Sequence, residues 1–441
     1  MTRRVSHPRG FQYFDREVET MPLDKLRALQ LERLQAAVFK AYRNEWYRQK
    51  FQAHGVTPDD LKSLEDLQKF PFTTKEDLLQ NYPTGLMVAP KEALVRYHMS
   101  SGTTGKPKVI PYTRKDIETW TKLMARTLAA VGVTSEDVVQ NCYGYGLFTG
   151  GLGFHYGAEA LGATVIPTGA GATERQIEIM LDMGSTVITC TPSYAIHLGE
   201  IIRARGIAPE KLKVRIGHHG AEPWTEEMRG RIEELWGFEE RGGGAYDIYG
   251  LSEMCGPGVA TECQAKNGLH IWSDHFIPEI IDPKTGVPLA AGKQGELVLT
   301  NVTKDAMPLI RYRTGDITSL IPEPCICGRT HPRMERITGR TDDMLIIRGI
   351  NVFPSQVEHV LIGHTELAPA YLIVVDKRQA LAELSVQVEP KAGVELGSDF
   401  QSRLERELQA KLGLRCAVEM KKPGELPRFE GKAKRVRIIT E

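Results

Sequence analysis

Apolar residues recur at roughly helical spacing over the first 80 or so positions of the chain. Leu23, Leu26, Leu29, Leu31 and Leu34 lie in a polar background, so this region is predicted to be helical. Further along, short apolar runs typical of strands alternate with helical patterns. A repeated strand–helix alternation predicts a largely parallel sheet whose two faces are covered by helices.

The predicted elements of this alternation can be located by residue number. Strands are expected at 164–167, 186–190 and 214–216, and helices at 192–205 and 226–236. Thr173 and Gln176 resemble a capping box, in which the two side chains satisfy backbone N–H groups at the start of a helix. A helix is therefore expected to open there, between the first two strands.

The last 100 residues follow a different pattern. Segments 383–388 and 416–420 alternate as half-buried strands do. Between them, one apolar helix face is formed by Phe400, Leu404, Leu408 and Leu412, which recur every four residues. We therefore expect an α/β protein with a large, multi-layer N-terminal domain, residues 1–341, and a small α+β C-terminal lid domain, residues 342–441.

Length and composition agree with more than one domain. The chain has 441 residues, too many for one ordinary core. It carries 56 basic and 56 acidic residues, and this zero formal charge argues against nucleic acid as the main partner. The sequence shows no signal-peptide pattern and no apolar run long enough to span a membrane. Seven cysteines, an odd number, favour free or metal-bound thiols in a reducing compartment, so we expect a cytoplasmic protein.

A loop rich in glycine and hydroxyl groups follows the strand-like run at 94–99. It consists of Ser100, Ser101, Gly102, Thr103, Thr104, Gly105, Lys106, Pro107 and Lys108. Glycines let backbone N–H groups approach phosphate oxygens, hydroxyls add donors and lysine adds positive charge. The spacing differs from the nucleotide-kinase loop, because proline follows Lys106 where that loop has serine or threonine. A surface turn is the alternative, but the density of hydroxyls favours contact with phosphate.

Four further motifs follow this loop in order: Tyr246–Glu253, Arg311–Asp316, Gly339–Asp343 and Gly431–Lys432. Together the five resemble the adenylate-forming superfamily of acyl-CoA ligases, peptide-synthetase adenylation domains and luciferases. The resemblance is closest to phenylacetate–CoA ligases. It is carried by YGYGLFTGGLGFHYGAE, GAEPWTEEMR, DIYGLSEMCGPGVATEC, AMPLIRYRTGD and DDMLIIRGINVFPSQVE, and it extends from about residue 10 to residue 437.

The resemblance implies a role for each motif. The glycine-rich loop would bind phosphate, and the nucleotide would be surrounded by Gly220, Ala221, Glu222, Asp247, Ile248, Tyr249 and Gly250. Tyr249 would offer a flat face to adenine, and Asp247 would accept from its amine. Asp316 would bind the ribose hydroxyls, and Arg340 would reach ribose or phosphate.

The remaining implied roles concern catalysis and motion. Glu253 offers the hard oxygen ligand that Mg²⁺ prefers. Lys432 would bridge the acyl carboxylate and the α-phosphate, although its basic surroundings are also typical of a solvated face. Asp342 matches the hinge about which the small domain of the family rotates.

The activity that follows is ATP-dependent ligation of an aromatic acid, phenylacetate or a substituted aryl acid, to coenzyme A through an acyl-adenylate. This chemistry needs positioning and charge neutralisation more than a nucleophilic side chain. The expected partners are the acid, ATP with Mg²⁺, and coenzyme A, with the protein a monomer or homodimer. The alternatives are a superfamily member that does not use coenzyme A, such as a deazaflavin-adenylating synthetase or a carrier-loading domain, and a non-enzymatic nucleotide-binding protein. A dehydrogenase is disfavoured because no G-x-G-x-x-G follows a first strand.

The substrate pocket is expected near three aromatic side chains. Tyr143 and Phe148 are candidate walls of an aryl pocket, and an aromatic core is the equal alternative. His218 and His219 precede Gly220, at a position that is usually apolar or aromatic in the branch that the chain resembles. His219 could bond a hydroxyl or amino substituent of the acid, or it could be a satisfied histidine at the end of a strand.

Cysteines and histidines suggest a second, structural site. Cys325 and Cys327 form a C-x-C pair, and Cys263 and His270 lie earlier in the chain. Three thiolates and one imidazole make a tetrahedral zinc set. His331 could take the place of His270, and free buried cysteines are the alternative to a metal.

Overall fold

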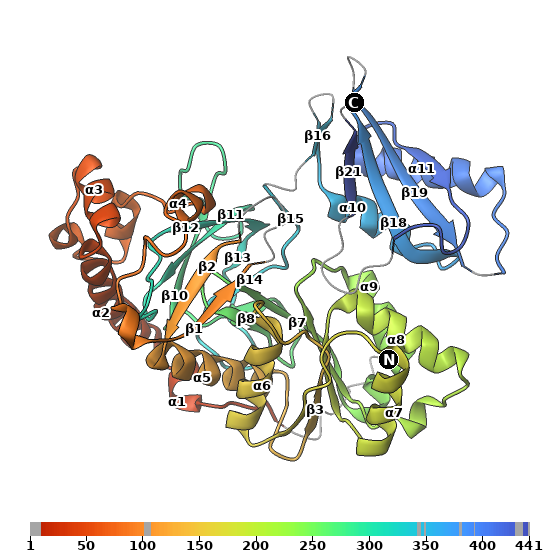
Figure 1. Ribbon diagram of the computed structural model, residues 1–441, viewed down its shortest axis with the longest axis horizontal. Coiled ribbons are helices and arrows are strands. Elements are labelled where there is room, and N and C mark those ends of the chain that lie inside the picture. The colour runs from red at the N-terminus through yellow and green to blue at the C-terminus, as the bar shows by residue number, and fades with distance from the viewer. Residues whose placement is uncertain are drawn as a thin grey trace. The chain divides into compact units, whose positions relative to one another are not determined.

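The chain divides into two compact units, each with its own sheet (Figure 1). This computed structural model describes residues 10–100, 107–341, 345–347, 350–378, 382–391, 393–427 and 435–439. The first unit comprises Met1–Ala221 and Leu235–Arg336, and the second comprises Glu222–Glu234 and Ile337–Glu441. Among the described residues, no helix has the length and apolar character needed to cross a membrane.

The first unit begins with helices, as predicted. They are α1 (Arg16–Glu19), α2 (Leu23–Tyr42), α3 (Glu45–Ala53) and α4 (Lys75–Gln80), with 3-10 turns at Pro58–Asp60, Glu65–Lys69 and Lys91–Ala93. α2 buries Leu26 and Leu34 and leaves Leu23 exposed. Asn44 starts α3 by accepting the N–H groups of Trp46 and Tyr47, which have no partner inside the helix.

A nine-stranded sheet forms the centre of this unit. Its strands are β3 (Val138–Asn141), β4 (Thr164–Ile166), β5 (Val187–Cys190), β6 (Ile216–Gly220), β7 (Gly244–Leu251), β8 (Gly256–Glu262), β9 (Leu269–Ile271), β13 (Leu320–Ile321) and β14 (Arg333–Met334). The order is β13-β14-β9-β8-β7-β6-β5-β3-β4. From β4 to β7 neighbouring strands are parallel, and from β7 to β13 they are antiparallel.

Helices cover both faces of the parallel part. They are α5 (Arg114–Ala130), α6 (Gly150–Leu161), α7 (Thr173–Met183) and α8 (Pro192–Ala204), with 3-10 turns at Pro209–Lys211 and Glu239–Arg241. The next helix in the chain, α9 (Glu226–Trp236), has residues 226–234 in the second unit. α5 and α6 pack together on one face, and α7 and α8 lie on the other (Figure 1). The expected parallel sheet with covered faces is therefore confirmed.

Two local predictions in this region were wrong. Thr173 is the first residue of α7, and the residue before it, Ala172, caps the helix with φ +50° and no side-chain hydrogen bond. Gln176 instead donates to the carbonyl of Gly169 at 2.8 Å, because the carbonyls of the loop before α7 lie within reach of its amide. The strand expected at 214–216 begins only at Ile216 and runs to Gly220.

Smaller sheets complete the first unit. β1 (Leu94–Met99) and β2 (Val109–Thr113) form an antiparallel pair around the glycine-rich loop. β10 (Phe276–Ile281), β11 (Gly295–Asn301) and β12 (Tyr312–Thr318) are antiparallel neighbours. Of the Arg311–Asp316 motif, Tyr312–Asp316 lie on β12 of this second sheet, and Arg311 directly precedes the strand.

The second unit is a small α+β structure, as predicted. Its elements are β15 (Gly339–Arg340), β16 (Leu345–Ile347), β17 (Ile350–Val352), α10 (Pro354–Ile362), β18 (Leu367–Asp376), β19 (Glu383–Pro390), α11 (Ser398–Leu412), β20 (Ala417–Met420) and β21 (Val436–Ile439). The sheet order is β20-β19-β18-β21. The predicted apolar face of α11 is confirmed, since Phe400, Leu404, Leu408 and Leu412 all enter the core. Asp342 lies outside the described residues, so its role as a hinge and the boundary at 341/342 stay predictions.

Candidate active site

Two of the predicted nucleotide motifs, Gly220–Ala221 and Asp247–Gly250, lie at or just after the carboxyl ends of parallel strands in the first unit. Register pairs Cys190 of β5 with His219 of β6, His219 with Asp247 of β7, and Gly220 with Ile248. Open parallel sheets bind ligands beyond the carboxyl ends of their strands. The topology therefore brings motifs that are far apart in sequence to one edge of the sheet.

Tight backbone packing shapes this edge. A Cβ on Gly220 would lie 2.4 Å from the carbonyl oxygen of Ile248, and one on Gly250 would lie 2.1 Å from that of Gly256. Any larger residue would push the strands apart. Ala221, directly after β6, has φ +70°, a strained conformation for alanine that often marks a functional turn. Glu222 follows it and belongs to the second unit.

Tyr249 and Asp316 connect the second and third motifs. The Tyr249 hydroxyl donates to Oδ2 of Asp316 at 2.6 Å, and both side chains are buried. The Asp316 N–H donates to Oγ1 of Thr314 at 3.0 Å. The aromatic face predicted for adenine and the carboxylate predicted for ribose are thus neighbours, although 67 residues separate them in the chain.

Glu253 is an ionised, buried carboxylate. Its Oε1 accepts from the Tyr312 hydroxyl at 2.9 Å and forms an ion pair with Nζ of Lys108. Burial alone would raise the pKa of Glu253, but the Lys108 ammonium outweighs this effect and the pKa falls below its usual value. Both contacts use Oε1, so Oε2 is the oxygen that could serve a hard cation.

Strands β1 and β2 clamp the ends of the glycine-rich loop. The Ser100 N–H donates to the Lys108 carbonyl at 3.1 Å, and the Lys108 N–H donates to Oγ of Ser100, also at 3.1 Å. The rest of the loop, residues 101–106, and Lys432 are not among the residues that the structure describes. Arg340 belongs to the second unit, on β15.

Two charged residues of this region were missed by the role assignments made from sequence. Lys108 was visible as the last residue of the glycine-rich loop, but its ion pair with Glu253 was not predicted. Arg336 has its Nε 3.7 Å from Oδ2 of Asp247 and its Nη2 3.5 Å from Oε1 of Glu262. No motif contains Arg336 and Glu262 together, so only the fold could show this cluster.

Tyr143, which follows β3, forms hydrogen bonds to the last residues of β5 and β6. Its hydroxyl accepts the Gly220 N–H at 2.9 Å and donates to the Cys190 carbonyl at 2.8 Å. Its buried ring stacks on Phe154, with centroids 5.3 Å apart and planes 4° from parallel. Phe148 differs, since it is 44% exposed in the segment before α6. The two candidate pocket walls thus lie in different surroundings.

The two histidines of β6 are buried and point to opposite faces of the strand, as consecutive strand residues do. Nδ1 of His219 lies 3.1 Å from the Cys190 carbonyl oxygen, and Nε2 of His218 lies 3.0 Å from Oγ1 of Thr261. Burial, together with the neighbouring His219, lowers the pKa of His218 to about 3, so His218 is neutral at physiological pH. Gly217 makes room for the other ring, because a Cβ there would lie 2.2 Å from Nε2 of His219.

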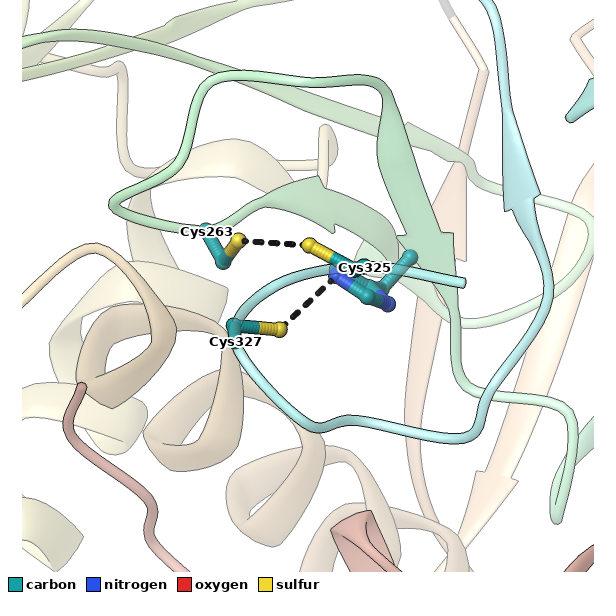
Figure 2. Close-up of side chains that lie close together, drawn as sticks. Cys263, Cys325 and Cys327 are labelled. Atoms are coloured by element: carbon teal, nitrogen blue, oxygen red, sulfur yellow. Dashed lines mark hydrogen bonds between the residues drawn. The ribbon is translucent and has the colours of Figure 1, made fainter. Parts of the chain in front are cut away.

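The four predicted metal-binding residues come together at a different place in the same unit. The ligand atoms of Cys263, His270, Cys325 and Cys327 all lie within 4.8 Å of one another (Figure 2). His331, the alternative to His270, instead has its Nδ1 3.1 Å from the backbone nitrogen of Ser273. The structure therefore selects His270 as the fourth member of this cluster.

Comparison with known proteins fits the fold and this geometry. Residues 35–303 match the AMP-binding enzyme family, and residues 349–437 match the AMP-binding enzyme C-terminal domain. A solved 2-hydroxyisobutyryl-CoA ligase, in complex with 2-HIB-AMP in the postadenylation state, superposes with a TM-score of 0.89 at 29% sequence identity. That match covers 99% of this chain and 94% of the other. The fold and the nucleotide motifs therefore define an adenylate-forming enzyme.

Sequence relatives narrow the class further. The phenylacetate-coenzyme A ligase of Thermus thermophilus is 49% identical over 434 residues, which cover 94% of this chain and 96% of the relative. The enzyme of the same name from Escherichia coli K12 is 48% identical over 427 residues, covering 95% and 96%. This chain belongs to the phenylacetate–coenzyme A ligase family. It is an AMP-forming acid–CoA ligase that uses ATP and coenzyme A.

Proposed function

We propose that the acid activated by this enzyme is phenylacetate or a ring-substituted aryl acid. The observation that carries the proposal is the 49% identity to a phenylacetate-coenzyme A ligase over 94% of the chain. The stacked rings of Tyr143 and Phe154 and the imidazole of His219 lie at or behind the carboxyl edge of the parallel strands. Aromatic surroundings of this kind favour a planar, apolar acid.

The reaction consists of two displacements. A carboxylate oxygen of the acid attacks the α-phosphorus of ATP, and the bond to diphosphate breaks. The thiol of coenzyme A, losing its proton, then attacks the acyl carbonyl carbon, and AMP leaves. Charge must be neutralised in the first step, because an anion approaches a polyanion.

The chain's own groups fit these needs. The Tyr249 ring would stack on adenine, and Asp316 would accept the ribose hydroxyls beside it. Oε2 of Glu253 would bind Mg²⁺, which supplies positive charge to the phosphates. Ser100 and the rest of the glycine-rich loop would hold the phosphates, and Lys432 would approach the α-phosphate and the acyl oxygen.

His219 is the residue that we propose to sense ring substituents. It lies on β6 two residues before the strained Ala221, and its Nδ1 faces the Cys190 carbonyl. An imidazole can bond a hydroxyl or amino substituent of the acid, which a phenyl ring cannot do. Exchange of His219 for phenylalanine should lower kcat/KM for hydroxylated acids more than for phenylacetate.

A panel of acids tests the proposal. Purified protein is given ATP, Mg²⁺ and either phenylacetate, 4-hydroxyphenylacetate, benzoate, 2-hydroxyisobutyrate or hexanoate, with and without coenzyme A. We expect AMP and an acyl-CoA thioester, with the highest kcat/KM for an arylacetate. Glu253→Gln is the control that removes the proposed magnesium ligand and should abolish acid-dependent diphosphate release. Preference for an aliphatic acid, or AMP formation without any thioester, would contradict the proposal.

A further inference from the structure

A cluster of three thiols and one imidazole lies in the first unit, apart from the nucleotide motifs. Cys263 directly follows β8, and Cys325 and Cys327 lie in the segment between β13 and β14 (Figure 2). His270 is the middle residue of β9. β14 pairs with β9, and β9 pairs with β8. Strand pairing therefore brings together residues that lie up to 64 positions apart in the sequence.

We propose that Cys263, His270, Cys325 and Cys327 bind one structural zinc ion. Sγ of Cys263 lies 3.7 Å from Sγ of Cys325, and Sγ of Cys327 lies 3.4 Å from Nε2 of His270. Zn–S bonds of about 2.3 Å and Zn–N bonds of about 2.0–2.1 Å in a tetrahedron place two sulfurs roughly 3.8 Å apart, and a sulfur and a nitrogen roughly 3.6 Å apart. These two separations agree with the expected edges to within about 0.2 Å, and all four ligand atoms lie within 4.8 Å of one another.

The donor set is closed. All four residues are buried, and the most exposed of them, Cys325, is only 8% exposed. A catalytic zinc keeps one position for water or substrate, whereas a structural zinc takes four protein ligands. Three sulfurs and one nitrogen favour zinc over magnesium or calcium, which take oxygen. The chemistry of acid activation has no need of this ion.

The surroundings of His270 support ligation through Nε2. Its Nδ1 lies 3.3 Å from the carbonyl oxygen of His331, so the proton is held on Nδ1 and the lone pair of Nε2 faces the thiols. This is the usual second contact of a zinc-bound histidine. It also explains why His331 is not a ligand, since its carbonyl orients His270 and its ring bonds elsewhere.

A disulfide is the competing explanation for the closest pair. A disulfide requires the sulfurs to be about 2.0 Å apart, against 3.7 Å for Cys263 and Cys325. A disulfide between these two cysteines would also leave unexplained why the Cys327 thiol and the His270 imidazole lie beside them. Three buried thiols and an imidazole gain little from one another without a metal, because S–H groups form only weak hydrogen bonds.

The zinc would fix a segment with little regular structure. From Glu323 to Pro332 the chain has neither helix nor strand. This segment nevertheless forms hydrogen bonds with residues near the N-terminal end of the first unit. The Tyr13 hydroxyl donates to the Cys327 carbonyl, and Thr330 donates to the Met21 carbonyl at 2.6 Å. The ion would thus cross-link the segment to β8 and β9 and, through it, anchor the N-terminal helices.

Metal content of single variants tests the proposal. The protein is purified without added zinc or chelator, and its metals are measured by elemental analysis. We expect about one zinc per chain in the parent, a loss of at least nine-tenths in Cys325→Ser and in His270→Gln, and full retention in His331→Gln. Cys142→Ser is the matched control, because Cys142 is a buried thiol of the same unit outside the cluster. Loss of zinc should also lower the Tm by several degrees.

Thiol modification and metal replacement in the parent protein test the proposal even if the variants do not fold. An organomercurial should release one zinc per chain while it modifies three protected thiols, and cobalt(II) replacement should give the strong visible absorption of tetrahedral thiolate coordination. A parent that has no zinc after growth in zinc-supplemented medium would overturn the proposal. So would five titratable thiols instead of seven after denaturation in chelator, the sign of a disulfide. These readouts do not depend on which acid the enzyme activates.

Discussion

Exchange of Lys108 for methionine is the sharpest probe of the candidate active site. Lys108 and Glu253 form an ion pair in which the side chains are only 15% and 7% exposed. Methionine keeps much of the apolar stem but removes the charge. Glu253 is then left in a buried site, where it still accepts from the Tyr312 hydroxyl but has lost the ammonium of Lys108. It must either stay ionised without this cation or take up a proton.

The smaller of these two penalties sets the loss of stability. An unpaired buried charge costs about 3–5 kcal/mol. Protonating a carboxyl whose ordinary pKa is about 4.3 costs about 3.7 kcal/mol at pH 7 and about 1 kcal/mol at pH 5. Lys108→Met should therefore lower the free energy of unfolding by about 3–4 kcal/mol at pH 7 and by only about 1 kcal/mol at pH 5.

The parent protein should behave differently over this range. Its Glu253 pKa is lowered in the folded state, so the pair contributes stability above the unfolded pKa and loses it only as the pH falls through the folded pKa. Between pH 7 and pH 5 that contribution is nearly constant. The difference between variant and parent should thus shrink as the pH falls.

Urea denaturation followed by tryptophan fluorescence at pH 7 and pH 5 measures this difference. The double variant Lys108→Met/Glu253→Gln is the control, because it removes both charges and should show a smaller loss with no pH dependence. A loss in Lys108→Met that is equal at the two pH values, or a double variant as unstable as the single one at pH 7, would refute the reasoning.

Three further changes probe other parts of the chain. Asp316→Asn removes the charge predicted to bind ribose, worth about 1.5–3 kcal/mol, and should lower kcat/KM for ATP about ten- to hundredfold, mainly through KM; Tyr249→Phe, which keeps the carboxylate, should have a smaller effect in the same steady-state assay. Glu19→Gln leaves Arg329, whose side chain is fully buried, without its carboxylate and should lower the free energy of unfolding by about 3–5 kcal/mol. Urea denaturation measures this loss, and an unchanged free energy of unfolding would show that the ion pair does not stabilise the fold. Asp342→Pro should leave acid-dependent diphosphate release largely intact and slow thioester formation; equal loss of both half-reactions would argue against a hinge there.

Sequence patterns determined most of the elements, because periodicity depends only on neighbouring residues. The helical repeat of Phe400, Leu404, Leu408 and Leu412 matches α11, and the β-branched run before Cys190 matches β5. The capping prediction at Thr173 failed for a related reason. The Gln176 side chain could accept the backbone N–H of the N-cap residue or donate to the carbonyl of Gly169. Which bond forms depends on the shape of the preceding loop, and local spacing does not specify that shape.

The residue types of the motifs also determined which chemistry the chain supports. A glycine-rich hydroxyl loop, a tyrosine, two carboxylates and a terminal lysine in fixed order predict nucleotide-dependent acid activation before any coordinates are known. They do not say which groups touch. Tyr249 reaches Asp316, and Lys108 reaches Glu253, only because the fold of the first unit brings strands of different sheets together.

The metal cluster shows most clearly which features residue types predict and which only the tertiary structure decides. The sequence supplied three cysteines and two histidines as candidate ligands and left the choice between His270 and His331 open. The pairing of β9 with β8 and β14 decides it, because a ligand atom must lie within a few ångströms of the others. Residue identity fixes what a side chain can bind, while the order and register of the strands fix which side chains meet.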